Sequence, residues 1–296
     1  MADTSTPVHR SASDEASGDV TGSHATASSV AIVGCGLIGA SVAKALSQQG
    51  CTIFVSDTNP EHMDLLVKEN VVTPWRGQRV DVVVVATPPS AVAEVVQAAH
   101  AMCPTAVITD VTSVKSAVAS ALAGKPGAAR FVGSHPLAGG TGTGPESANA
   151  DLFIGKPWAI VPNSESDGDA VQWVHRVVRW CGAIPLQMSA AEHDRVLALT
   201  SHAVQVVSSA VAGQLLKLDA DQVALSGPAL RDVTRIAASN AQLWQEILML
   251  NSAEVAPHLR ALAKELLDVA TALESGDTAA MIEFMQRGNE GRRLLG

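Results

Sequence analysis

The sequence predicts an α/β protein in which a doubly wound parallel sheet precedes an all-helical region. Short apolar strands alternate with helical segments from Val30 to about Pro162, and a G-x-G-x-x-G pattern follows the first of these strands. From Val171 onward, almost every segment has helical periodicity. Strands that alternate with helices are typical of a parallel sheet, which binds its ligand at the carboxyl ends of the strands.

Length and composition allow two domains. The chain has 296 residues, 47% of them hydrophobic, which is enough for two sizeable cores. Residues 1–28 are rich in Ser, Thr, Ala, Asp and Gly and lack an apolar signal-peptide core, so we expect a disordered leader there. A polar stretch then separates an expected dinucleotide-binding domain over 29–165 from an expected helical substrate and dimerisation domain over 171–296.

The net charge restricts the classes of binding partner, and the cysteines indicate the redox state of the compartment. A net charge of −9 argues against nucleic acid and against an anionic membrane surface. The apolar runs in the sequence are shorter than the ~20 residues that a membrane span requires. The four cysteines are scattered without a C-x-x-C pair, so we expect reduced thiols in a cytoplasmic protein and no metal site.

The stretch "VAIVGCGLIGASVAKAL" has the context of a phosphate-binding turn, because an apolar strand precedes the glycines and a helix follows them. Gly34 allows a tight turn, Gly36 a close approach of the backbone to a pyrophosphate, and Gly39 close packing of helix on strand. The helix N-terminus offers unpaired N–H groups to the anion. The predicted cofactor contacts in this stretch are Gly34, Gly36, Leu37, Ile38 and Gly39.

Further cofactor contacts are expected where the next strands end. The strand Cys51–Ser56 ends at Asp57, 21 residues after Gly36, where a carboxylate hydrogen-bonds the adenosine ribose. Asp57 repels a 2′-phosphate, so NAD is favoured, with NADP still possible. Thr87 and Asp110, which follow two further apolar strands, complete the predicted cofactor contacts. The alternative is a purely structural turn with Asp57 present by chance.

Two motifs at strand ends carry candidate catalytic groups. In "TDVTSVK", Asp110, Ser113 and Lys115 follow an apolar strand, and they either face the cofactor or cap the next helix. In "GSHPLAGGTGTG", His135 precedes a glycine-rich loop. A histidine at this place is suited to proton transfer, although a lone histidine is more often structural or merely exposed.

The helical region holds polar residues among apolar ones. His202 and Gln205 share a helix face, and their partners are either neighbouring helices or a ligand. Arg231 and Arg235 lie one turn apart in "RDVTRIAASNAQLW". In so acidic a chain, they form either a pocket for a carboxylate or a surface salt bridge.

Together, these motifs resemble those of the prephenate and arogenate dehydrogenases of tyrosine biosynthesis. "VGCGLIGAS", "DVTSVK", "SHPLAGG", "HD" followed by "SHAVQ", and "RDVTRIAASNAQLW" occur in that family's order, from about Val30 to Asn251. The resemblance implies a Rossmann-type domain that binds NAD, followed by a helical domain that forms a homodimer. It also implies that the glycine turn holds a phosphate.

The resemblance assigns roles to individual residues. The family's catalytic histidine corresponds to His135, its active-site serine to Ser113, its carboxylate-binding arginine to Arg235, and a substrate-site histidine to His202. Two positions depart from the family pattern: Gln205 stands where a second histidine is expected, and Thr141 where an acidic residue is often found. The predicted substrate contacts are therefore four residues: Arg235, His202, Gln205 and Thr141.

The implied reaction is NAD-dependent oxidative decarboxylation of prephenate to 4-hydroxyphenylpyruvate. His135 would accept the proton of the ring alcohol, Ser113 would orient His135 or the hydroxyl, and Arg235 would hold a substrate carboxylate. Both departures lie where side-chain contacts are expected, so arogenate dehydrogenase is the alternative. Another Rossmann-type hydroxy-acid dehydrogenase and a non-catalytic NAD-binding protein also stay open.

Overall fold

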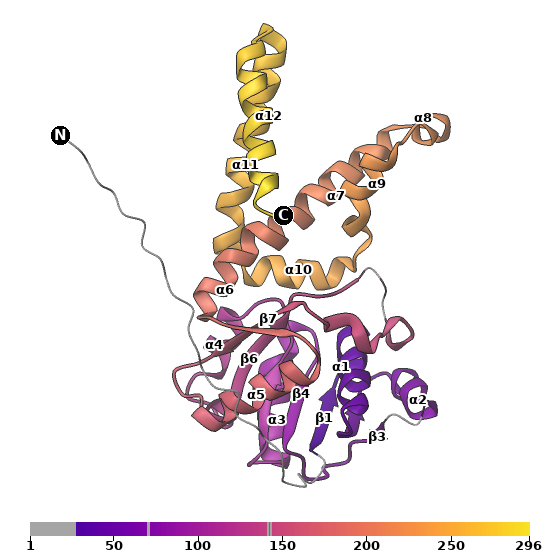
Figure 1. Cartoon of the computed structure of the whole chain (residues 1–296), viewed down its shortest axis with the longest axis vertical. Helices are drawn as coiled ribbons and strands as arrows, with labels where there is room; N and C mark the ends of the chain where they lie inside the picture. The colour runs from indigo at the N-terminus through magenta and orange to yellow at the C-terminus, as the bar shows by residue number, and fades with distance from the viewer. Residues whose placement is uncertain (1–27, 70–71, 141, 143) are drawn as a thin grey trace, which may run out of the picture.

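The computed structural model describes residues 28–69, 72–140, 142 and 144–296. The leader expected over residues 1–28 lies, up to residue 27, outside the described residues. Figure 1 shows a layered α/β body from which a helical region projects.

The body is built on one eight-stranded sheet with the order β3-β2-β1-β4-β5-β6-β7-β8. All neighbouring strands are parallel except β6 and β7, which are antiparallel. The chain leaves β1 in one direction toward β2 and returns to β4 on the other side, so the strand order reverses between β1 and β4. Ligands bind at this position in doubly wound sheets. The strands are β1 (Ser29–Val33), β2 (Thr52–Ser56), β3 (Thr73–Pro74), β4 (Val82–Val85), β5 (Val107–Asp110), β6 (Phe131–Pro136), β7 (Pro157–Pro162) and β8 (Ile184–Gln187).

Helices cover both faces of the sheet, and the central strands are apolar on both sides for this reason. Along β4, Val82 and Val84 pack into the core on the side of α1 and α5, whereas Val83 and Val85 pack into the core under α3. This alternation follows from the period of two in a strand. The predicted doubly wound α/β fold is confirmed. The helices of the body are α1 (Leu37–Gln48), α2 (Pro60–Lys68), α3 (Val92–Met102), α4 (Ser116–Leu122) and α5 (Gly168–Trp180).

The sheet domain extends further along the chain than the sequence indicated. The helical domain was expected to begin at residue 171, but α5 packs on the sheet with Val174, Val177 and Val178 buried, and β8 pairs with β7. Helical periodicity alone cannot tell a helix that covers a sheet from one in a separate bundle. The edge strand β8 is short and mostly exposed, so it lacks the apolar run that reveals a buried strand.

Beyond residue 189 the described chain is helical. A continuous run passes from α6 (Ala190–Leu197) through a π-helical segment (Ala198–Ala203) into α7 (Val204–Gln214). Two arms then diverge, one formed by α7, α8 and α9 and the other by the α11–α12 hairpin, with α10 lying across their base (Figure 1). These helices are α8 (Ala220–Ala224), α9 (Pro228–Thr234), α10 (Ala241–Leu250), α11 (Ser252–Ser275) and α12 (Thr278–Arg293).

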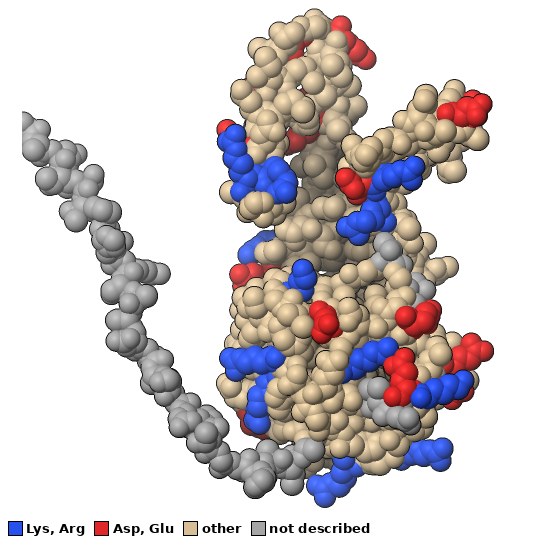
Figure 2. Space-filling model, turned by 45° about the vertical axis from the view of Figure 1, so that its right-hand side comes forward, with Lys and Arg blue, Asp and Glu red and all other residues tan. Residues whose placement is uncertain are grey.

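The arms carry apolar side chains that the chain itself does not cover. Leu216, Leu225 and Leu294 are 91%, 86% and 87% exposed. In the view of Figure 2, much of the arm surface is uncharged. Exposed apolar side chains grouped in this way are typical of a protein–protein interface.

The helical run Ala190–Lys217 also corrects an expectation. By length and composition alone it is apolar enough to cross a membrane, and one third of its most apolar 18-residue window is buried within the chain. The sequence did not reveal this because His193, Asp194, His202 and Gln205 interrupt the apolar stretch. A core helix passes the same test, and the buried polar side chains of this run are bonded to other parts of the chain.

Candidate active site

The fold requires glycine at some positions of the turn after β1 and not at others. Gly34 has φ +99°, and a Cβ atom there would lie 2.5 Å from the carbonyl oxygen of Ala86. A Cβ atom on Gly39 would overlap the carbonyl oxygen of Gly34. The fold itself therefore requires glycine at these two positions.

Gly36 is different, because its backbone is in an extended conformation (φ −70°) and a Cβ atom there would meet no described heavy atom within 4 Å. The fold gives no reason for a glycine here. The open space lies at the start of α1, where Leu37 and Ile38 form the first turn, and within the described part of the chain no side chain caps this helix. An uncapped helix N-terminus beside a position without a side chain fits a phosphate group.

Asp57 follows β2 and is held toward the glycine turn. Its carboxylate accepts hydrogen bonds from the backbone N–H of Cys35 (2.5 Å) and of Asn59 (2.7 Å). Thr87 follows β4, at the point where the strand order reverses, and its buried hydroxyl has no partner among the described residues. An unpaired buried hydroxyl at this place fits a hydrogen-bonding ligand. The roles of both residues stay predictions.

Asp110 does not have the cofactor role that its strand-end position indicated. Its side chain is fully buried, and its carboxylate pairs with the ammonium of Lys115 and accepts hydrogen bonds from the Thr112 hydroxyl and from the Ser134 backbone N–H. Lys115 also donates to the Ser134 carbonyl, at 2.7 Å. Because no part of Asp110 is accessible to a ligand, its side chain stabilises the ends of β5 and β6.

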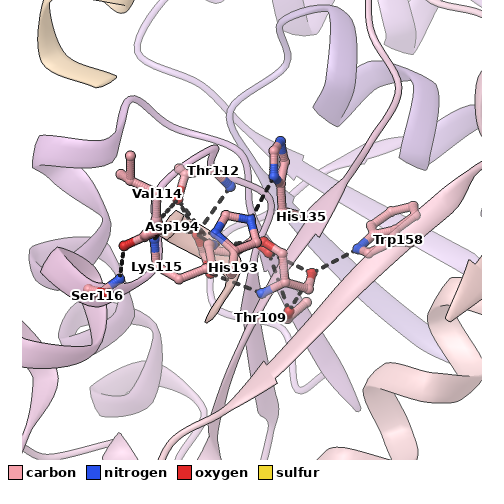
Figure 3. A network of polar contacts seen from close by, with 11 residues as sticks. Thr109, Thr112, Val114, Lys115, Ser116, His135, Trp158, His193 and Asp194 are labelled. Atoms are coloured by element: carbon pink, nitrogen blue, oxygen red, sulfur yellow. Dashed lines mark hydrogen bonds and ion pairs between the residues drawn. The ribbon is translucent and has the colours of Figure 1, made fainter. Parts of the chain in front are cut away.

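Three side chains form a hydrogen-bonded row, which we call the imidazole relay: His135, His193 and Asp194 (Figure 3). His135 extends from the carboxyl end of β6, and its Nδ1 lies 2.9 Å from Nε2 of His193. Nδ1 of His193 lies 2.8 Å from Oδ1 of Asp194. All three side chains are buried or nearly so.

Asp194 fixes the far end of the relay. Its carboxylate accepts the backbone N–H groups of Lys115 (2.9 Å) and Ser116 (2.8 Å), at the start of α4. Burial alone would raise the pKa of Asp194, but the hydrogen bonds from His193, Ser116 and Lys115 lower this pKa to about 2. The group is therefore a carboxylate at neutral pH and can only accept hydrogen bonds.

His135 is neutral in this environment. Burial holds its pKa well below the usual histidine value, and the charges of Lys115 and of two neighbouring histidines act in the same direction. Ser113, which we expected to orient either His135 or the substrate hydroxyl, forms no hydrogen bond with His135 within the described ranges, and its role toward the hydroxyl stays a prediction. The orienting partner at Nδ1 is His193. The family resemblance gave Ser113 its role, whereas His193 was not assigned because only the fold brings it, 58 residues away, to His135.

His202 lies on the same helical run and is fully buried. The amide nitrogen of Asn251 contacts both the Asp194 carbonyl (2.9 Å) and Nδ1 of His202 (3.0 Å). The carbonyl fixes the orientation of this amide, which then donates to Nδ1 and leaves the hydrogen of neutral His202 on Nε2. Burial lowers the pKa of His202 to about 4. Nε2 forms no hydrogen bond of normal geometry among the described residues, although the backbone of Ser113 faces the ring and acts to raise its pKa.

Arg235 and Gln205 lie together in the helical region. Arg235 is exposed, and the described residues offer its guanidinium no ion pair or hydrogen bond, contrary to the salt-bridge alternative. Gln205 is buried and donates to the Ile236 carbonyl at 3.0 Å, which holds the backbone next to Arg235. Thr141, the remaining predicted substrate contact, lies outside the described residues.

Sequence reasoning missed three residues of the site: His193, Asp194 and Asn251. The "HD" pair was visible as a motif, but it had no assigned role because neighbouring residues on a helix do not normally face one partner. Asn251 gave no signal, since it is a single amide at the junction of α10 and α11. The residues that the structure describes contain no group of three or more His, Cys, Asp or Glu side chains that could hold a metal ion.

A doubly wound sheet with open space at the start of α1 and a buried, neutral histidine at the end of β6 defines a dinucleotide-dependent oxidoreductase. Comparison with known families is more specific. A model of the prephenate dehydrogenase nucleotide-binding domain matches residues 42–185, and one of the prephenate dehydrogenase dimerization domain matches residues 189–287. The chain belongs to the prephenate dehydrogenase family.

Individual relatives agree with this assignment. The chain is 33% identical to a probable prephenate dehydrogenase, NovF, of Streptomyces niveus, over 88% of this chain and 75% of that protein. It is 31% identical to the cyclohexadienyl dehydrogenase of Zymomonas mobilis, over 90% of this chain and 95% of that protein. The crystal structure of Aquifex aeolicus prephenate dehydrogenase with hydroxyphenyl propionate and NAD+ is similar, with a TM-score of 0.84 and 25% identity, over 93% of this chain and all of that chain.

Proposed function

We propose that the protein catalyses the NAD-dependent oxidative decarboxylation of prephenate to 4-hydroxyphenylpyruvate, a step of tyrosine biosynthesis. The observation that carries this proposal is the state of His135, which is buried, neutral and held through Nδ1, so that Nε2 is left for the substrate. Family membership over both halves of the chain supplies the substrate class.

The open space at Gly36 and the unpaired hydroxyl of Thr87 support a bound dinucleotide at the reversal of the strand order. When bound, NAD supplies the acceptor for the hydride that leaves the carbinol carbon of the substrate. Asp57 would accept the adenosine ribose hydroxyls, which favours NAD over NADP.

The protein's own residues have to accept one proton from the substrate and later return it. Nε2 of His135 accepts it from the ring hydroxyl as the carbinol carbon becomes a carbonyl carbon. The ring then loses its carboxylate as CO₂, the electrons of that bond restore aromaticity, and the phenolate oxygen takes the proton back from His135. Because aromatisation drives the reaction, alignment and proton transfer are the main contributions of the site.

Two further groups are available to the substrate. The unpaired guanidinium of Arg235 is suited to a substrate carboxylate, through charge-assisted hydrogen bonds. The Nε2–H group of His202 is a neutral donor for another substrate oxygen.

Arogenate is the second candidate substrate, and Gln205 is the observation that favours it. Arogenate carries an ammonium where prephenate carries a keto group. A histidine at position 205 would repel the ammonium when charged, whereas Gln205 is neutral and its NH₂ group is bonded to Ile236. The site therefore lacks a feature at this position that would exclude arogenate.

The active form is proposed to be a homodimer. The exposed apolar side chains of the two arms, such as Leu216, Leu225 and Leu294, support a partner on this surface, and a second copy of the chain fits the dimerization domain that matches residues 189–287. Covering these side chains would contribute about 25 cal/mol for each Å² of apolar area removed from water.

The test is NADH formation with prephenate, with arogenate and with a panel of small hydroxy acids, each repeated with NADP. We expect turnover of prephenate with NAD, and turnover of arogenate at a comparable or lower rate. Turnover of a hydroxy acid alone would assign the protein to another dehydrogenase reaction. NAD binding without turnover of any substrate would indicate a non-catalytic NAD-binding protein.

A further inference from the structure

We propose that His193 and Asp194 are positioning residues that hold His135 in the tautomer with its hydrogen on Nδ1, so that Nε2 is the base, and that His193 shares the proton which His135 accepts. This inference deepens the proposed function and rests on it for the proton donor, the ring hydroxyl of the substrate. With His193 neutral, the tautomer itself follows from the contacts of the relay.

The argument begins at the carboxylate. Asp194 is ionised and only accepts, so the His193 nitrogen that faces it at 2.8 Å must carry a hydrogen. A neutral imidazole has one N–H group. The other nitrogen of neutral His193, Nε2, is therefore an acceptor.

The same reasoning applies to the next pair. Nε2 of His193 and Nδ1 of His135 are 2.9 Å apart, a distance that requires a hydrogen between them. When both rings are neutral, only His135 can supply it. If the hydrogen of His135 were on Nε2, two lone pairs would face each other at this distance.

The position of the hydrogen decides whether His135 can act. With Nδ1 donating to His193, Nε2 of His135 carries a lone pair and is free of partners within the described part of the chain. This is the nitrogen that can accept the substrate proton. With the opposite tautomer, Nε2 would be a donor and could not serve as the base.

The relay also provides a place for the added charge. When Nε2 of His135 takes the hydroxyl proton, its Nδ1 hydrogen can move to Nε2 of His193. His135 is then neutral again, and the positive charge is on His193, 2.8 Å from the carboxylate of Asp194. When the phenolate is protonated, it takes the proton from Nε2 of His135, and the proton on Nε2 of His193 returns to Nδ1 of His135. Protons therefore balance over the cycle.

The surroundings make this displacement useful. Burial disfavours a cation on His135 most, and positive charge on His193, on Lys115 or on His202 acts in the same direction, so His135 and His193 do not both carry a positive charge. The Asp194 carboxylate is the group that opposes them, and it reaches His135 through His193. The carboxylate is also fixed by two backbone N–H groups at the start of α4, so it does not move during the transfer.

The direct test reads the tautomer without catalysis. Nitrogen-15 NMR of histidine-labelled protein, without substrate and at pH 7, distinguishes a protonated from an unprotonated ring nitrogen in each of the nine histidines. We expect the hydrogen of His135 on Nδ1. A His135 signal with the hydrogen on Nε2 would overturn the proposal, whatever the activity of the protein.

Two substitutions at one position then separate the roles. His193→Leu keeps a buried side chain of similar size but removes the acceptor. We expect His135 to lose the Nδ1 tautomer and kcat to fall roughly 10²–10⁴-fold, as for an orienting group of a catalytic histidine, with KM changed less than about threefold. His193→Gln can place its carbonyl oxygen near the former Nε2, so it should retain the tautomer and restore part of kcat.

The control is His175→Gln, at a histidine of α5 that faces Gln187 and lies outside the relay. It should change neither kcat nor the His135 signals. A His193→Leu protein with unchanged kcat and KM would overturn the proposal. If this variant does not fold, the proposal is still tested by the position of the His135 hydrogen in the parent protein and in His193→Gln, which should be Nδ1 in both. Failure of the proposed function looks different, because neither prephenate nor arogenate would then be turned over while the tautomer could still be as assigned.

Discussion

The clearest perturbation of the cofactor site is Gly36→Ala, because the fold gives no reason for this glycine. The added methyl group would meet no described heavy atom within 4 Å. Two small effects on stability oppose each other: a Gly→Ala change at an accommodating backbone conformation stabilises by about 0.4–1 kcal/mol, whereas alanine is a poorer N-cap by a similar amount. We therefore expect the free energy of unfolding to change by less than about 1 kcal/mol.

Binding of NAD should respond quite differently. If a pyrophosphate lies against the backbone at Gly36, the methyl group occupies its place, and overpacking of this kind costs about 1–3 kcal/mol. At ~1.4 kcal/mol per tenfold change, the Kd of NAD should rise roughly 5- to 150-fold. Calorimetric titration with NAD and denaturant unfolding measure the two quantities on the same preparation.

Gly39→Ala is the matched comparison. Its methyl group would overlap the Gly34 carbonyl oxygen within the fold, so the backbone must shift. This variant should lose stability by about 1–3 kcal/mol as well as NAD affinity. A Gly36→Ala protein that binds NAD within twofold of the parent would refute the assignment of this space to a phosphate.

Three further outcomes are expected. His135→Asn should lower kcat ~10²–10⁴-fold with a smaller effect on KM. Because the pKa of His135 is lowered, its neutral form persists on acidification, so the acid limb of kcat/KM in the parent should lie below the ~6.5 of free histidine. An acid limb above that value would contradict the burial argument. Arg235→Gln should raise KM roughly 10- to 100-fold through loss of a hydrogen bond of about 1.5–3 kcal/mol. The exposed Arg79→Gln, in the sheet domain, should leave KM unchanged, and equal effects of the two substitutions in steady-state kinetics would argue against a specific carboxylate site. Asp57→Ser should weaken NAD and narrow the difference between NAD and NADP in parallel titrations, and a parent that prefers NADP would show that Asp57 has been misinterpreted.

Much of the sheet domain could be predicted because its signals are local. The glycine pattern, the apolar strand before it and the carboxylate at the end of the next strand lie within about 30 residues, and each has a direct backbone consequence. Asp110 shows the limit of this reasoning. A strand end is where a cofactor contact is expected, but the same place also receives the side chain of Lys115, and a carboxylate beside a buried ammonium is no longer available to a ligand.

The helical region was predictable as helical, but its surface could not be assigned. A helix that is apolar around much of its circumference indicates burial, whereas Val196, Leu199 and Val204 are exposed along the run from α6 to α7. A single chain cannot bury every face of two diverging arms. The sequence shows which helix faces are apolar, but it does not tell whether they pack within the chain or on a partner.

The catalytic arrangement was the least predictable part because it is assembled across both regions of the chain. The proposed base, His135, is on β6, the last strand that runs in the same direction as β1, whereas His193 and Asp194 are on the first helix beyond the sheet. The side chain of Asp194 binds backbone N–H groups of the sheet domain, and its carbonyl binds Asn251, which sets the tautomer of His202. In the proposed arrangement, Asp194 therefore affects the tautomers of two histidines. Its carboxylate acts through His193, so that Nε2 of His135 is an acceptor, and its carbonyl acts through Asn251, so that Nε2 of His202 is a donor. This arrangement forms only when α6 is docked on α4, so the state of the base depends on contacts between the regions and not on any one motif.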